Sequence, residues 1–564
     1  MPRRLPPPWA LTVLLAVAFL LATPATTDLA AQAHRVPLGG DGAWLVDLSW
    51  FGGHHLPGYS VLLPVLGLVL GAPLIGALSA VAAAWAFGRL ARAAWPGTPG
   101  LVAAWWFAAG AGGLLFTGRV AFLLGAACGL GTLVVATAPG RRPPAGRPAP
   151  AADPDRAPPA APPSPRGTAA RTPARTAAVV AGAALTALGS PVAALFLAMA
   201  GAAWTVATPR GARRTPAVLT VAAFVAACVL ALGFPTGGTE PFVASALWPA
   251  VVALAACVLV LPRDQRVLRA GAALYLAAVL ASGLLPTPMG GNATRLAALA
   301  GGPLLAGALW GRRPLALALL AVPFLYWQWY PPVRDAAQAY GDPSANAAHW
   351  RPLADELRAR VAAAPTRVEV PPAARRGEAR WIPDDVPLAR GWVRQLDRDR
   401  NPLFYDDLRH GPLTGTAYRR WLDDQAVGWV ALTDATPDPA SRDEVALLRA
   451  GAVPGLTLAR RTPDYVLWRV DRPRPLAAWT DGRGGPPPRV VRMRPGGLRV
   501  ALPRPGTVDL RIRWSPYLRA TRGVCLHEAP GGWTRMRAAV RGTVDVGTGL
   551  AVPWRRAAPA GCSG

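Results

Sequence analysis

The first 330 residues alternate long apolar stretches with short polar loops. Apolar runs of about 20 residues with few charges predict membrane-spanning helices. The first run extends from Ala10 to Ala22. Further helices are expected at 72–92, 100–116, 119–138, 176–189, 191–207, 216–234, 242–261, 267–285, 292–310 and 313–330. The pattern therefore predicts a multi-pass α-helical membrane protein with about 11 spans.

Three parts of this pattern allow two interpretations. The first run follows two arginines and precedes a small-residue stretch, which is typical of a cleavable signal peptide. We favour an uncleaved first span, because many more spans follow. The stretch Leu56–Val69 fits either the start of the second span or a short interfacial helix, and 176–207 fits two short spans or a re-entrant pair.

Arginine placement predicts the orientation of the spans. With the N-terminus inside, every inward loop carries at least two arginines and no outward loop carries more than one. The outward arginines are Arg35, Arg119 and Arg295. Because loop arginines stay on the cytoplasmic side, this alternation predicts a cytoplasmic N-terminus. An odd number of spans then places residues 331–564 outside the cell membrane.

Charge density divides the chain further. Residues 1–330 carry 22 arginines and 7 acids, and the remainder carries 37 and 24. The membrane part divides into residues 1–138, with four helices and a long first outward loop, and residues 176–330, with seven helices. Between them, 139–175 is rich in Pro, Ala and Arg, which predicts a disordered cytoplasmic linker.

The outward C-terminal part is expected to fold as two domains. Helix-like and strand-like patterns alternate over 331–484, which indicates an α/β domain. Residues 485–564 show short strands with Gly/Pro turns, which favours a β-sandwich-like domain. Cys525 and Cys562 lie here, and an oxidising compartment would allow them to form a disulfide. No Walker, dinucleotide or G-x-S-x-G motif is present.

A net charge of +28 is a footprint of nucleic-acid binding in soluble proteins. Here the positive-inside pattern and an Arg-only usage explain the charge, so no nucleic-acid partner is expected. Membrane lipid is the expected partner of the spans. The excess of arginine in the C-terminal part also suits an anionic envelope polysaccharide.

The acids of the membrane part gather on its outward side. Asp28, Asp41, Asp47 and Glu240 all fall in outward loops, together with the lone arginines Arg119 and Arg295. Ionisable groups near a membrane are costly unless paired or functional, so this side is the candidate site. Arg295 follows Asn292 in the segment PTPMGGNATRL, and either arginine suits a phosphate group.

The first outward loop also carries the pair His54/His55. Adjacent histidines are poor chelators on a helix, where metal ligands prefer i,i+4 spacing, so no metal ligand is assigned. A divalent cation remains an open cofactor, and no other cofactor is indicated. We place both histidines with Glu240 and Asn292 as supporting residues.

The architecture resembles the GT-C glycosyltransferases, because it combines a long acidic first outward loop, many spans and an extracytoplasmic C-terminal domain. The segment DLSWFGGHHLPGYSVLLP also resembles a group of actinobacterial integral membrane proteins, some of which carry transporter labels. In GT-C enzymes an Asp of the first loop is the catalytic base or a metal-site residue, and the donor is a polyprenyl-phosphate sugar.

The resemblance implies sugar transfer from a polyprenyl-phosphate donor to a cell-envelope acceptor at the outer face. Asp47 is the first candidate for the base and Asp41 the second, while Arg295 and Arg119 would hold the lipid phosphate. Glu240 would orient the acceptor. Two other functions stay open, namely a transporter or flippase and a non-catalytic envelope-assembly protein. The near absence of charges within the spans disfavours transport.

Overall fold

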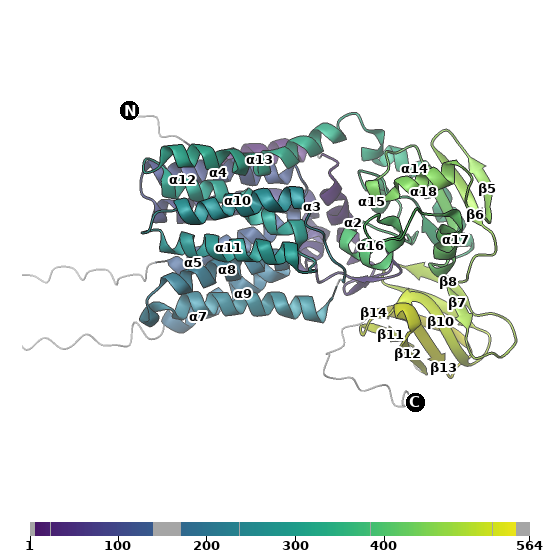
Figure 1. Cartoon of the computed structure of the whole chain (residues 1–564). Coiled ribbons are helices and arrows are strands. Elements are labelled where there is room, and N and C mark those ends of the chain that lie inside the picture. The colour runs from purple at the N-terminus through teal and green to yellow at the C-terminus, as the bar shows by residue number, and fades with distance from the viewer. Residues whose placement is uncertain are drawn as a thin grey trace, which may run out of the picture.

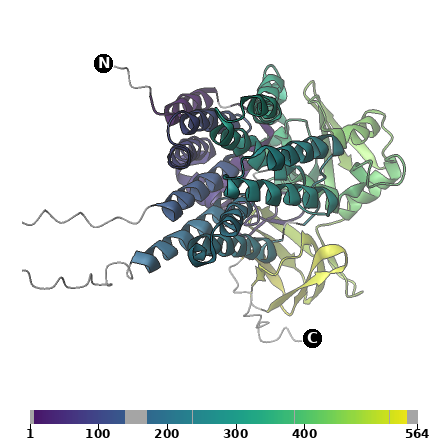
Figure 2. The same cartoon turned by 60° about the vertical axis from the view of Figure 1, so that its left-hand side comes forward.

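The computed structural model describes residues 6–22, 24–138, 171–235, 237–383, 385–521 and 523–548. Most of the predicted linker 139–175 and the cysteine Cys562 lie outside these residues, so the linker and the Cys525–Cys562 disulfide stay predictions. Figures 1 and 2 show a bundle of roughly parallel helices whose one end meets the C-terminal part. That part holds an α/β unit and a β-sandwich side by side.

The bundle is built from apolar helices. Their bounds are α1 Trp9–Ala22, α2 Thr27–Leu38, α3 Leu62–Ala94, α4 Thr98–Leu115, α5 Val120–Thr137, α7 Arg171–Gly189, α8 Pro191–Ala207, α9 Arg214–Gly233, α10 Ala244–Val260, α11 Arg266–Leu284, α12 Gly302–Leu309 and α13 Pro314–Ala339. Among the described residues, five (α3, α4, α5, α9 and α11) are long and apolar enough to cross a membrane. The pair α1 and α2, bent by 75°, would make a sixth. These helices confirm a membrane protein, but not the count of about 11 spans.

Large apolar side chains on the outside of the bundle agree with a lipid environment. Val69, Leu232, Leu259 and Leu284 are each more than 75% exposed. Apolar side chains are more stable in apolar surroundings than in water, and the hydrocarbon of a membrane provides such surroundings. Helix α3 also contains a kink at Gly71, where φ is +72°. The segment 62–70 before this kink overlaps the stretch Leu56–Val69, for which the sequence allowed a short helix ahead of the main span, but the helix begins only at Leu62.

The α/β unit follows α13. It contains α14 Ala347–Ala363, α15 Gly377–Trp381, α16 Arg394–Arg400, α17 Gly415–Asp424 and α18 Arg442–Arg449, with β3 Arg367–Glu369, β4 Val427–Thr433, β5 Leu456–Arg461 and β6 Tyr465–Val470. The strands form one sheet in the order β3-β4-β6-β5. Strand β3 pairs parallel with β4, and the other neighbours are antiparallel.

The β-sandwich contains two four-stranded antiparallel sheets, β12-β13-β10-β7 and β11-β14-β9-β8. Its strands are β7 Ala477–Trp479, β8 Arg489–Arg494, β9 Gly497–Leu502, β10 Gly506–Arg513, β11 Leu518–Ala520, β12 Val524–Ala529, β13 Trp533–Ala538 and β14 Gly542–Thr548. Because β7 pairs with β10, the sandwich begins before residue 477 instead of at the predicted 485.

The first outward loop enters both C-terminal cores. Its two short strands β1 Val46–Asp47 and β2 His54–His55 form a small antiparallel pair. Leu45, Val46 and Leu48 pack in the core of the β-sandwich, whereas Trp50 and Phe51 pack in the core of the α/β unit. Backbone bonds fix it on both sides, from Leu48 N to Pro495 O at 2.8 Å and from Leu388 N to Ser49 O at 2.7 Å.

A network of buried charges lies in the core of the α/β unit. Arg390 donates to Asp397 and to Glu444, and all three side chains are at most 2% exposed. Tyr418 donates to the other oxygen of Glu444 at 2.7 Å. Glu369 lies beside Glu444, and within the described part of the chain no arginine forms an ion pair with it. Burial and the charge of Glu444 raise the pKa of Glu369 well above its usual range.

This network predicts a loss of stability with rising pH. The folded chain holds a proton on Glu369 that the unfolded chain releases near pH 4.3. The contribution of Glu369 to stability is therefore full below that pH and falls as the pH rises toward the folded pKa, by at most about 1.4 kcal/mol per pH unit. Glu369→Gln mimics the protonated group and should flatten this slope in melting curves from pH 5 to 8. Glu528→Gln, at an exposed position of the sandwich, should follow the wild type. Parallel slopes for wild type and Glu369→Gln would contradict the assignment.

Candidate active site

The structure encloses Asp47, the first candidate for the base, on all sides. Its side chain is fully buried, and Oδ1 accepts from Ser49 N at 2.8 Å. Oδ2 lies 3.1 Å from His34 Nε2 and 3.9 Å from His54 Nδ1. The Trp50 ring stacks on both imidazoles. Asp47 thus fixes the first loop.

Electrostatics agree with this structural role. Burial alone would raise the pKa of Asp47, but the hydrogen bond and charge of His34 outweigh it and lower that pKa to about 2. Burial lowers the pKa of His54 to about 3, so this histidine is neutral at physiological pH. Among the described residues, neither ring nitrogen of His54 has a hydrogen-bond partner.

The other predicted residues of the loop lie apart from Asp47. Asp41 is exposed and borders a shallow groove on the β-sandwich with Arg494 and Arg499. His55 points away from His54, as neighbours on a strand do. Its Nδ1 donates to Pro235 O at 2.7 Å, and its Nε2 lies 3.0 Å from Ser515 Oγ. The two histidines therefore cannot chelate one ion.

A different set of charges meets at the end of the bundle, and Arg119 belongs to it. Its Nε lies 3.0 Å from Oδ2 of Asp28, which stands in the first turn of α2. The tight turn before α5 makes this contact possible through Gly118, where φ is +76°. A Cβ there would lie 2.4 Å from the backbone nitrogen of Leu29. The hairpin tip therefore touches the start of α2, and Arg119 reaches Asp28.

Arg295 joins the same set from an irregular helix. A 3₁₀ turn, η2 Gly290–Thr294, precedes it and a π-helical turn, η3 Ala297–Gly301, follows. The Tyr275 hydroxyl enters this break, where it accepts from Ala297 N at 3.1 Å and donates to Ala293 O. Such π-turns are frequent at functional sites. Asp28, Arg119 and Glu240 are the charged neighbours of Arg295.

Arg295 has no acidic hydrogen-bond partner. Within the described part of the chain it makes no hydrogen bond or ion pair through its side chain, and its buried Nε is unpaired. Its guanidinium lies 5.8 Å from the centroid of the Phe122 ring. The backbone carbonyl of Asn292, a predicted supporting residue, accepts a hydrogen bond from the backbone N–H of Arg295. A half-buried guanidinium whose Nε has no partner among the described residues is costly, which makes Arg295 a candidate for holding an anion.

Glu240 reaches this cluster from the loop between α9 and α10. Its backbone nitrogen donates to Thr287 O at 3.1 Å, and its backbone packs so tightly on Gly290 that no Cβ fits there. Burial raises the pKa of Glu240 above its usual value, against the opposing charges of Arg394, Arg398 and Arg295. Both Arg394 and Arg398 stand on α16 of the α/β unit. The C-terminal part therefore contributes charge to the cluster.

Arg35 completes the cation set. Its side chain is 2% exposed and lies over the Tyr59 ring, 3.9 Å from the centroid. Its Nε and Nη1 have no hydrogen-bond partner among the described residues. Asp28 and Asp47 are the acids whose negative charge acts on the Arg35 guanidinium. Burial lowers the pKa of Arg35 below its usual value. We call Asp28, Arg35, Arg119, Glu240 and Arg295 the outer cluster.

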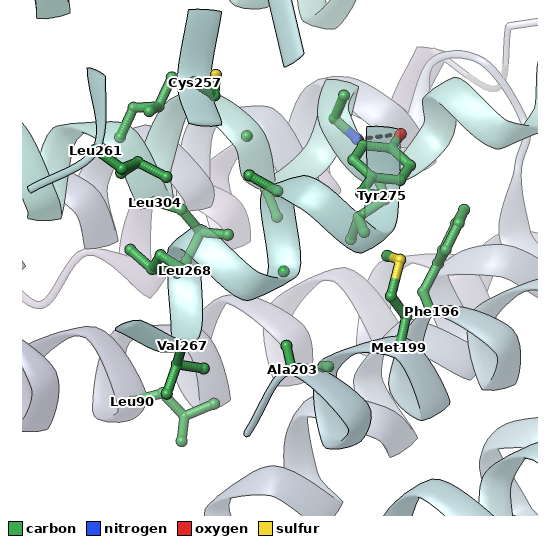
Figure 3. A pocket seen from close by; sticks show the side chains of 18 of the residues that line it. Leu90, Phe196, Met199, Ala203, Cys257, Leu261, Val267, Leu268, Tyr275 and Leu304 are labelled. Carbon is green, nitrogen blue, oxygen red and sulfur yellow. Dashed lines mark hydrogen bonds between the residues drawn. The ribbon is translucent and has the colours of Figure 1, made fainter. Parts of the chain in front are cut away.

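An apolar cavity begins one residue beyond Arg295. It has a volume of about 350 Å³ and is lined almost wholly by carbon, with Phe196, Met199, Tyr275 and Leu304 among its walls (Figure 3). Leu296 and Ala297 also line it, so the backbone that carries Arg295 forms part of its wall. Phe196, a wall residue of the cavity, contacts Phe122 edge-on, with 6.1 Å between the ring centroids. Phe122 is also the ring that lies near the guanidinium of Arg295, so the two rings connect the cavity to Arg295. Its volume falls in the range of ligand pockets.

Within the described residues, no group of three or more His, Cys, Asp or Glu side chains could hold a metal ion. The outer cluster instead offers cations in excess of carboxylates, three arginines against two acids. An arrangement of this kind suits an anionic group such as a phosphate.

The structure therefore brings together Arg119, Arg295 and Glu240 from the predicted set, and leaves Asp47, Asp41 and His55 elsewhere. The sequence places Asp28 among the outward acids and Arg35 among the outward arginines, but predicts a site role for neither. The position of Asp28 directly after the first span is a signal that favours it, and Arg35 shares the outward placement of Arg119 and Arg295. Tyr275 carries no such signal, because its role depends on contacts with a distant segment.

The enclosure of Asp47 predicts a structural effect on substitution. Its folded pKa of about 2, against 3.8 for the free group, corresponds to about 2 kcal/mol of stability. That stability is present above pH 4 and is lost as the pH falls toward 2. Asp47→Asn should lower the melting temperature at pH 7 by several degrees. Asp41→Asn, at an exposed site, should not. An unchanged melting temperature for Asp47→Asn would restore Asp47 as a functional candidate.

Comparisons with known proteins add no relative to this description. No protein-family model matches the chain, and no curated protein or solved structure matches it either. Any function assigned to the outer cluster therefore rests on the geometry and charge of its own side chains.

Proposed function

We propose that the chain is a membrane glycosyltransferase that moves a sugar from a polyprenyl-phosphate donor to a cell-envelope acceptor at the outer face. The proposal includes about 11 spans, a cytoplasmic N-terminus and an extracytoplasmic C-terminal part. It is supported by the gathering of Asp28, Arg119, Glu240 and Arg295 at the end of the bundle that meets that part. Trp392 joins the two directly, because its Nε1 donates to Thr27 O at 2.7 Å.

The carrying observation is Arg295, a cation with no ion pair among the described residues, which directly precedes Leu296 and Ala297 in the wall of an apolar cavity. A lipid phosphate has a charged head and a hydrocarbon chain, so it needs both environments next to each other. The chain would occupy the cavity lined by Phe196 and Leu304, and the phosphate would lie against Arg295 and Arg119. Burial of apolar surface contributes about 25 cal/mol per Å², and the guanidinium groups contribute specificity for the phosphate.

Asp28 replaces Asp47 in this proposal as the base. It belongs to the same first outward loop, its side chain is 21% exposed, and Arg35, Glu240 and Arg295 all sense its charge. In the structure Asp28 is paired with Arg119. A bound phosphate would compete for Arg119 and leave the carboxylate of Asp28 free to accept a proton.

The transfer step then balances as a single displacement. Asp28 takes the proton of the acceptor hydroxyl, and the acceptor oxygen forms a bond to the anomeric carbon of the sugar. The bond from that carbon to the phosphate oxygen breaks, and its electron pair leaves with the polyprenyl phosphate. Arg295 and Arg119 stabilise the charge that develops on this leaving group. Glu240 orients the acceptor from the side of α16.

Binding of the lipid can be measured apart from catalysis. Purified full-length protein should bind undecaprenyl phosphate at least about tenfold more tightly than undecaprenol, because only the phosphate pairs with arginine. Arg295→Gln should abolish this preference. Arg312→Gln is the matched control, since Arg312 lies in the turn between α12 and α13 and forms an exposed ion pair with Asp264. Equal binding of both lipids by the wild type would contradict the proposal.

Catalysis is tested by sugar transfer from labelled membrane lipids to envelope polysaccharide in membranes that contain each variant. Asp28→Asn should lower transfer by about 10² to 10⁴ while leaving undecaprenyl phosphate binding intact. Glu240→Gln should have a smaller effect that appears mainly in the acceptor KM. Wild-type transfer by Asp28→Asn would exclude it as the base. Protein-dependent movement of the lipid across vesicles without transfer would favour the flippase alternative.

A further inference from the structure

A groove lined by arginines lies on strands β8, β9 and β14 of the sheet β11-β14-β9-β8, far from the outer cluster in sequence. The groove has a volume of about 250 Å³ and is lined by Arg492, Arg494 and Arg499 together with Asp545 and Asp41. The three arginines are exposed. Among the described residues, Arg499 is the one of the three that has a carboxylate partner, with its Nε 2.7 Å from Asp545 Oδ1.

The strand register explains the shape of the groove. One row of directly paired residues runs across the sheet. Arg494 on β8 pairs with Gly497 on β9, Gly497 pairs with Gly547 on β14, and Gly547 pairs with Arg519 on β11. Residues that pair directly share a face of the sheet. The two glycines in the middle have no side chains, so the row forms an open floor between two arginines. A Cβ on Gly497 would lie 2.6 Å from Val546 O, which leaves glycine the only residue that fits without a shift.

The neighbouring row carries the charge. Arg492 pairs directly with Arg499, and Arg499 pairs with Asp545. Like charges placed opposite each other on a sheet destabilise it unless an anion lies between them. With Arg489 at the edge, the outward face of this sheet carries five arginines and one aspartate. On the other sheet, the outward Arg535 is neutralised by Asp509 at 2.7 Å.

We infer that this groove binds a polyanionic envelope glycan, whose carboxylate or phosphate groups pair with Arg492 and Arg494. Guanidinium groups bind such anions bidentately. Asp41 and Asp545 accept hydrogen bonds from sugar hydroxyls. Their presence disfavours an anionic membrane surface, as does the scarcity of large apolar side chains on this face, where only Val491 is strongly exposed.

If the groove binds the acceptor of the proposed transferase, that acceptor is a polyanionic glycan, and this step rests on the proposed function. Binding of the glycan to the groove can be measured without the transfer step. Strand spacing of about 4.8 Å lets the three strands that line the groove, β8, β9 and β14, span roughly 10 Å, which is enough for one or two sugar units. Asp41 connects the groove to the membrane part, because Asp41 O packs against Gly496 and Thr548 Oγ1 donates to Gly42 O at 2.9 Å.

The test uses full-length protein in detergent and measures binding of polygalacturonate, a glycerol-phosphate polymer and neutral dextran at 150 mM salt. The wild type should bind one or both anionic polymers at least about tenfold more tightly than dextran, with affinity falling as salt rises. The double variant Arg492→Ser/Arg494→Ser should lose this difference. Arg535→Ser, on the opposite sheet, should keep it, and all three proteins should bind undecaprenyl phosphate equally.

Three results would overturn the inference. Equal binding of anionic and neutral polymers would remove the charge recognition. An unchanged affinity in Arg492→Ser/Arg494→Ser would place any binding elsewhere on the chain. Full competition by vesicles of anionic lipid, with no competition by vesicles of neutral lipid, would assign the groove to the membrane surface. By contrast, the effect of Arg295→Gln on lipid-phosphate binding tests only the proposed transferase and has no bearing on glycan binding by the groove.

Discussion

The burial of the first outward loop is the constraint on which the rest of the structure depends. Leu45, Val46 and Leu48 complete the core of the β-sandwich, and Trp50 and Phe51 complete the core of the α/β unit. A loop between two membrane helices thereby supplies apolar surface to two other domains. Without it, both cores would expose large apolar side chains, and the C-terminal part would lose its fixed position over the bundle.

Asp47 and its histidines hold this loop in one conformation. A buried carboxylate is tolerated only where hydrogen bonds compensate for the lost water, and Ser49 N and His34 provide them. The same fixation positions α2, which carries both His34 and Asp28. Asp28 therefore reaches Arg119 at a distance that is set by the packing of the loop. The structural role of Asp47 and the chemical role proposed for Asp28 are linked through one helix.

The sequence predicted the features that depend on local pattern. Apolar runs located the helices of the bundle to within a few residues for α4, α5, α9 and α11, and alternating patterns indicated the α/β unit and the sandwich. The gathering of Arg119, Arg295 and Glu240 was also predicted as a shared side. The enclosure of Asp47 was not, because burial depends on strands and helices more than 300 residues away. Nor could local pattern reveal that β7, before residue 485, pairs with β10.

The span 292–310 shows most directly why pattern was insufficient at the site. Its apolar composition predicts one regular helix, whereas the chain forms a 3₁₀ turn, a π-turn and the short α12. The cause is the hydroxyl of Tyr275, which takes backbone bonds that a regular helix would make within itself. This irregularity lies directly after Arg295, and Leu296 and Ala297 at its start line the apolar cavity. Because π-turns of this kind are frequent at functional sites, the break marks the same place in the chain as the cation that has no acidic partner among the described residues.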